Sequence, residues 1–115
     1  MSEFTDYLSD VFERFGPITV RRMFGGYGIY HEGLMFALVA DETLYLKVDD
    51  VNVGDFAREG LEPFEYDKGD RVVRMSYHQA PEALFEDREL AMEWASRSFA
   101  AAQRAQAGKR KPARQ

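Results

Sequence analysis

The sequence predicts an α+β fold, a two-layer sandwich in which helices at both chain ends cover one antiparallel sheet. Helical periodicity marks the first fifteen residues, four short β segments follow in direct succession, and the end of the chain is again helical in pattern. With 115 residues the chain has the length of one domain. We predict a single domain over residues 1–108 and a disordered basic tail over residues 109–115.

The first half of the chain is predicted to form one helix and four strands. Apolar residues recur at i, i+3, i+4 and i+7 over residues 4–15, and Gly16 and Pro17 end this helix. Short connections between the following segments predict an antiparallel meander. Its strands are expected at residues 18–24, 27–31, 34–40 and 43–48, and the third is so apolar that a central place is expected for it.

The second half is predicted to hold a short helix, a hairpin and a long helix. The short helix spans about residues 50–59 and ends in a Schellman cap, with Gly60 at the left-handed position. The turn signal at residues 67–70 predicts a hairpin. Pro81 suits the first position of a helix that runs to about residue 107, with a break near Asp87, and Gly108 is expected to end it.

Charge is distributed unevenly along the chain. All twenty acidic residues and nine of the fifteen Lys and Arg residues lie within residues 1–96, so this part carries a net charge of −11. Residues 97–115 hold the other six basic residues and carry +6. An acidic body disfavours broad contact with nucleic acid, although the basic end is able to meet phosphates. We expect a cytoplasmic protein, because no apolar run is long enough to span a membrane and no cleavable leader is evident.

The usual catalytic and metal-binding patterns are missing from the sequence. There is no cysteine, which excludes disulfides and thiolate chemistry. His31 and His78 lack the spacing of a paired metal site, and Ser76 lies on a strand and not on a nucleophile elbow. We therefore predict a protein that is not an enzyme and that binds no metal or cofactor.

Three glycines interrupt the β pattern at residues 25–28. Gly25, Gly26 and Gly28 form a GGxG sequence, but a dinucleotide or phosphate loop would lead into a helix, and here a strand follows. We predict that they form a structural turn or bulge between the first two strands, where backbone segments approach closely.

The two arginines before these glycines are predicted to have different roles. Neighbouring strand residues face opposite ways, so Arg22 shares a face with Ile18 and Val20 and is the candidate for a buried, paired charge. Arg21 faces outward. Arg21, Tyr45, Lys47 and Arg74 are predicted to form a basic, aromatic patch for a partner, unless they pair with nearby carboxylates or cover the sheet edge.

Two stretches of this sequence resemble the N-terminal domain of the TfoX/Sxy family. The first is "RRMFGGYGIYHEGLMFALVADETLYLKVD", whose Arg-Arg-Met-Phe-Gly-Gly core is a fairly specific motif. The second is "GLEPFEYDKGDRVVRMSYHQAPEALFED", and together the resemblance covers about residues 4–105.

The resemblance implies a secretion-chaperone-like α+β fold and a role in regulation. Full-length family members regulate competence for DNA uptake, as co-activators thought to work with the cyclic-AMP receptor protein. They carry a second, helical domain that this chain lacks, so a stand-alone N-terminal domain is expected. The family has no established catalytic residues to carry over.

Three functional hypotheses remain open at this point. The first is a regulatory module that binds a protein partner, or a second copy of itself, through the predicted patch. The second is direct binding of nucleic acid through the patch and the basic tail. The third is an enzyme or a binder of small anionic ligands that uses a cleft near Arg22 and the glycines.

Overall fold

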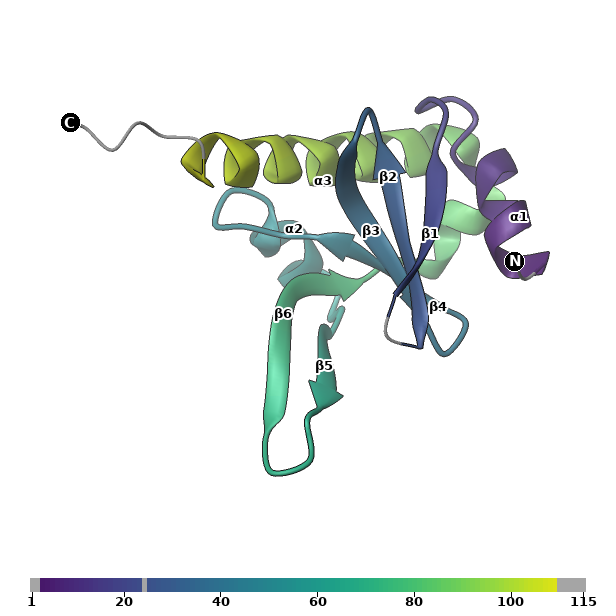
Figure 1. Ribbon diagram of the computed structural model, residues 1–115. Coiled ribbons are helices and arrows are strands. Elements are labelled where there is room, and N and C mark those ends of the chain that lie inside the picture. Colours follow the sequence, from purple (N-terminus) through teal and green to yellow (C-terminus); the bar gives the residue numbers. More distant parts are fainter. Residues whose placement is uncertain (1–2, 24, 110–115) are drawn as a thin grey trace.

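A computed structural model describes residues 3–23 and 25–109 of the chain (Figure 1). The elements occur in the predicted order of helix, meander, helix, hairpin and long helix. The helices are α1 (Glu3–Val11), α2 (Val53–Arg58), the 3-10 helix η1 (Glu82–Glu86) and α3 (Arg88–Lys109). The strands are β1 (Thr19–Met23), β2 (Gly26–His31), β3 (Leu34–Ala40), β4 (Thr43–Lys47), β5 (Pro63–Asp67) and β6 (Val72–Gln79).

The strands form one antiparallel sheet in the order β1-β2-β3-β4-β6-β5. The meander is confirmed, and the hairpin of β5 and β6 joins it by pairing β6 with β4. Helix α3 lies along one face of the meander, and the hairpin projects away from α3 (Figure 1). The predicted α+β fold, with helices at both chain ends, is therefore confirmed.

Strand β3 is buried on both of its faces. On the helix-covered inner face, a bulge between β2 and β3 inserts Phe36 as an extra residue, because Tyr30 pairs with Met35 while Ile29 pairs with Ala37. Phe36 is fully buried and contacts Phe12 edge-on, with ring centroids 5.5 Å apart. On the other face, Leu38 is also buried. The apolar run of β3 therefore supports two separate clusters.

Two helix boundaries, at Gly60 and at Asp87, have the local features that the sequence predicts. Gly60 has φ 68°, and the backbone N–H groups of Gly60 and Leu61 donate to the carbonyls of Ala57 and Phe56, which is the predicted Schellman cap. Asp87 is extended and separates η1 from α3, so the predicted break is confirmed. Its carboxylate accepts hydrogen bonds from the first N–H groups of α3, at 3.1 Å each.

Some predicted boundaries are wrong. Helix α1 ends at Val11, where turns replace the helix that was expected to reach residue 15. Pro81 precedes η1 as its cap residue and is not its first helical residue. Helix α3 continues through Gly108 to Lys109, so Gly108 does not end it. Phe24 and residues 110–115, which include most of the predicted tail, lie outside the described residues.

The three glycines of the predicted turn have three different surroundings. Gly25 has φ 79° and open space around it, as a turn residue needs. A β-carbon on Gly26 would lie 2.1 Å from the carbonyl oxygen of Val39, so only glycine lets β2 approach β3 there. A β-carbon on Gly28 would meet the sulfurs of Met23 and Met35 at 2.8 and 2.9 Å.

We predict that Gly26→Ala destabilises the protein by at least about 2 kcal/mol, because a rigid backbone oxygen occupies the new methyl position. The control is Gly108→Ala, whose β-carbon meets nothing within 4 Å near the end of α3. It should be neutral or stabilising by up to about 1 kcal/mol, since alanine is the better helix former. Urea unfolding of the three proteins measures both changes, and equal stability of the two variants would contradict this account of Gly26.

Candidate functional site

The face of the sheet opposite α3 carries a second apolar cluster. We call it the outer sheet face; its buried members are Leu38, Phe64 and Tyr77, and Met35, Ala40, Tyr45, Tyr66 and Met75 pack around them. The hairpin contributes Phe64, whose ring meets that of Tyr45 edge-on at 4.9 Å. The hairpin therefore covers part of this face.

Two cations lie over tyrosine rings on the outer sheet face. The guanidinium carbon of Arg21 is 5.0 Å from the ring centroid of Tyr30, and the ammonium of Lys47 is 5.2 Å from that of Tyr77. Burial raises the pKa of the Tyr77 phenol, and the nearby Tyr30 adds to the increase. Tyr77 thus stays a neutral donor, and its hydroxyl reaches the Met35 carbonyl oxygen at 3.4 Å.

The register brings three of the four predicted patch residues to this face. Arg21, Gly28, Leu38 and Tyr45 pair in one row across four strands, which separates Arg21 from Tyr45 by about 14 Å, or three strand spacings. Lys47 lies two residues beyond Tyr45 on the same strand face. These residues surround an apolar surface and do not form one continuous basic patch.

Arg74 lines the same hollow as Lys47, but it is bound to a carboxylate and is not a free cation of the predicted patch, which corrects that part of the prediction. Lys47 pairs with Tyr77, and Arg74 lies three residues before Tyr77, in a part of β6 whose pairing with β5 is irregular. Its guanidinium donates two hydrogen bonds to Glu65, at 3.0 and 2.8 Å, across the hairpin. The alternative that patch residues pair with carboxylates thus holds for Arg74.

Arg22 is exposed, so its prediction as a buried charge is wrong. The reason is that β1 is an edge strand, while α3 packs mainly over β3 and β4. Arg22 lies at a surface hollow of about 440 Å³ with Met23, Gly25, Gly26 and Tyr27. No helix begins among these lining residues, so the hollow lacks the helix terminus that phosphate sites commonly use.

The two histidines have structural roles. The imidazole of His31 contacts the carbonyl oxygen of Pro17 at 2.7 Å and packs against the rings of Phe15 and Phe99. His78 contacts the carbonyl oxygen of Leu61 at 2.8 Å. Within residues 3–23 and 25–109, no group of three or more acidic or histidine side chains is placed to hold a metal ion.

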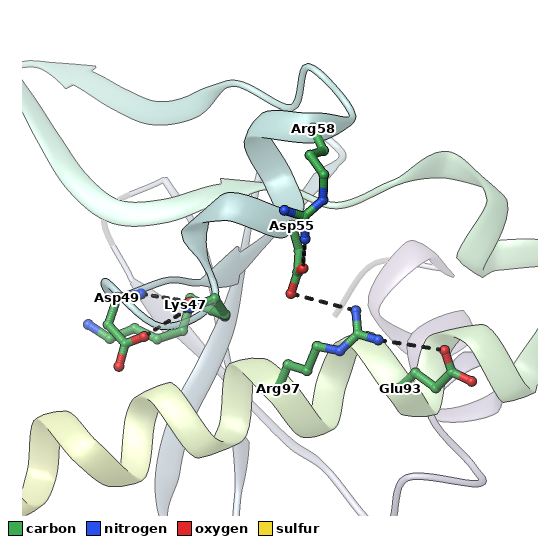
Figure 2. Close-up of polar contacts among 7 residues, drawn as sticks. Lys47, Asp49, Asp55, Arg58, Glu93 and Arg97 are labelled. Carbon is green, nitrogen blue, oxygen red and sulfur yellow. Dashed lines mark hydrogen bonds and ion pairs between the residues drawn. The ribbon is translucent and has the colours of Figure 1, made fainter.

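A polar connection fixes the loop after β4 to helix α3. Arg104 donates to both oxygens of Asp49, at 2.6 and 3.0 Å, and this hydrogen bonding holds the pKa of Asp49 below its usual range. The buried Asn52 accepts from the Asp49 N–H and donates to the Lys47 carbonyl oxygen. Lys47 at the end of β4 and Asp49 in the loop after it lie close together near α3 (Figure 2).

A second connection joins α2 to the middle of α3. Asp55 pairs with Arg58 on its own helix and with Arg97 of α3 at 3.7 Å, and Arg97 also reaches Glu93 at 3.9 Å (Figure 2). The cations of this region are thus largely neutralised by carboxylates.

The sheet opens into a wedge beside Lys47. Pairing of β3 with β4 runs only from Ala37 to Ala40, and β6 pairs with β4 only from Tyr77 to Gln79. The start of β3, at Leu34 and Met35, therefore lies apart from β6, and β4 pairs with neither strand there. We call the resulting hollow of about 540 Å³ the wedge; its apolar lining includes Met23, Met35, Met75 and Tyr77, and Ala102 and Ala105 of α3 close it.

The sequence reasoning did not bring Tyr30, Met35 and the buried Tyr77 to the outer sheet face. One signal was available: residues 34–40 are apolar at every position, which requires partners on both sides of the strand. What the sequence does not reveal is that the hairpin turns its Met75 and Tyr77 side toward the outer sheet face.

Fold and site define an α+β domain whose sheet face opposite α3 is aromatic and only partly covered by the hairpin. A sequence model of the TfoX N-terminal domain family matches residues 10–102, and the chain belongs to this family. It is also 31% identical, over 86 residues, to the DNA transformation protein TfoX1 of Aliivibrio fischeri. That alignment covers 75% of this chain but 41% of the relative, so the chain corresponds to under half of that protein's length.

Because the Asp49–Arg104 pair lowers the pKa of Asp49, we predict a pH-dependent contribution to stability. The contribution is fully present above the ordinary aspartate value of 3.8 and is lost as the pH falls through the lower pKa of the folded state. Arg104→Ala should therefore cost about 1 kcal/mol at pH 7. Its difference from the wild type should vanish in strong acid.

Urea unfolding between pH 7 and pH 2 tests this. The matched control is Arg58→Ala, which removes a more exposed partner from the Asp55 pair. It should change stability less than Arg104→Ala at pH 7. A cost of Arg104→Ala that stays constant down to pH 2 would show that the ion pair is not its source.

Proposed function

We propose that this chain is a regulatory module without enzymatic activity that binds another protein on its outer sheet face, in the control of DNA-uptake competence. The observation that carries the proposal is the outer sheet face itself, on the side of the sheet opposite α3, where the half-buried Met35, Tyr45 and Met75 surround its buried core. Aromatic residues, methionine and arginine are the types enriched where proteins bind each other.

The link to competence rests on family membership and on the relative named as a DNA transformation protein. Because the alignment covers under half of that relative, the transcriptional step and the partner belong to the proposal. A cytoplasmic location follows from a role in gene regulation. Among the described helices none is long and apolar enough to cross a membrane.

A different protein suits this face better than a second copy or nucleic acid. Two copies placed face to face would bring Arg21 and Lys47 near the same cations of the other copy. For nucleic acid, several cations outside this face are already engaged, since Arg74 of the hairpin and Arg97 and Arg104 of α3 each pair with a carboxylate. A phosphate backbone would have to displace these partners.

We predict that Arg21→Glu lowers natural transformation and the transcription of DNA-uptake genes in a strain whose own copy is deleted. The reversal leaves the fold intact because Arg21 is exposed, but it places a carboxylate where the proposed partner meets the face. The expected decrease is roughly tenfold, which corresponds to about 1.4 kcal/mol of lost binding. Transformant counts and transcript levels measure it.

Arg71→Glu is the control, because it makes the same charge change on the exposed hairpin tip. Thermal unfolding should show that both variants are folded. If deletion of the gene leaves transformation and these transcripts unchanged, the competence role is wrong. If Arg21→Glu and Arg71→Glu behave alike, the outer sheet face is not the docking surface.

A further inference from the structure

The wedge differs from the rest of the outer sheet face because flexible methionine side chains line it. Met23 and Met35 place their sulfurs over Gly28, where any side chain would displace them, and Met75 lines the same hollow. Methionine side chains are unbranched and polarisable, so such a surface can reshape around apolar side chains of different forms. Its volume of about 540 Å³ is in the range of ordinary binding pockets.

The rim of the wedge is positively charged. Lys47 hydrogen-bonds to the Ser76 hydroxyl at 2.8 Å, and within residues 3–23 and 25–109 neither Lys47 nor Lys109 has an ion-pair partner. Burial lowers the pKa of Lys47, the charge of Lys109 lowers it further, and Asp49 opposes both. A carboxylate from outside would relieve this unfavourable pairing of two cations.

We propose that the wedge is a docking groove for an acidic amphipathic helix of a partner protein. Apolar side chains of the helix enter between the methionines and Tyr77, and its carboxylates meet Lys47 and Lys109. This inference rests on the proposed function, in that it states the chemistry of the partner that the regulatory module binds.

The chemistry of the wedge favours this occupant over others. A second copy would present the same two lysines and repel them. Nucleic acid would leave the three methionines facing a charged backbone, and Arg74 at the rim is already bound to Glu65. An amphipathic helix matches both features, because apolar residues spaced at i, i+3, i+4 and i+7 form a stripe with acids on its flanks.

The test is a display selection in which a library of random 16-residue peptides is screened for binding to the purified chain. Selected peptides are expected to carry an apolar stripe of helical period with acidic residues beside it. A synthetic copy of the best peptide should lose at least about tenfold in affinity for the double variant Lys47→Glu, Lys109→Glu, as measured by fluorescence anisotropy. It should shift the methyl NMR signals of Met23, Met35 and Met75.

The matched control is Lys68→Glu with Arg71→Glu, which makes the same change in net charge at the hairpin tip, where both side chains are exposed. This control should keep the wild-type affinity. The proposal is overturned if no peptide is enriched, if the enriched peptides lack acidic residues or helical spacing, or if both double variants bind the peptide equally. It is equally overturned if the three methionine signals do not move.

The outcomes separate this inference from the proposed function. If the lysine double variant supports normal transformation while Arg21→Glu does not, the regulatory module stands and the wedge is not its docking groove. If deletion of the gene has no effect on competence but acidic helices still bind the wedge, the groove stands and the pathway is wrong.

Discussion

The burial of strand β3 on both faces is the constraint on which the rest of the structure depends. Its inner side needs the helices and the turns after α1, where Phe12 and Phe15 pack against Phe36. Its outer side needs a second cover, because Leu38 would otherwise be left in water. The hairpin supplies that cover through Phe64 and Tyr77, and this is why β6 returns to pair with β4.

The hairpin cannot cover the whole outer side. It pairs with β4 over three residues and then turns away, so the ladder ends while β3 continues to Leu34. The Tyr77 hydroxyl crosses this gap to the Met35 carbonyl oxygen, which has no strand partner in β4. The same separation creates the wedge, which is lined by Ala102 and Ala105 of α3.

Local chemistry in the sequence was enough to predict the order of elements. Turn residues, the Gly60 cap and the break at Asp87 depend on neighbours within a few residues, and those predictions held. Local predictions failed at the end of α1, at Pro81 and at Gly108. The errors in the predicted site concern Arg22 and Arg74, whose surroundings depend on strand order and register. Whether a residue lies at an edge, or which pleat it occupies, is decided by distant segments, and a shift of one residue reverses every side chain.

The distribution of charge decides how the outer sheet face and the wedge differ. Arg97 and Arg104 of α3 form ion pairs with carboxylates, so the electrostatic field of these two cations is short-ranged and screened. Lys47 and Lys109 lie at the end of this network, where Asp49 is already bound to Arg104. A protein with an acidic body thus keeps a small cationic site next to an apolar one. A partner that lacks carboxylates would gain only the apolar contact there, and a partner that lacks apolar side chains would gain only the ion pairs. The two neighbouring sites together therefore favour a partner that carries both kinds of side chain.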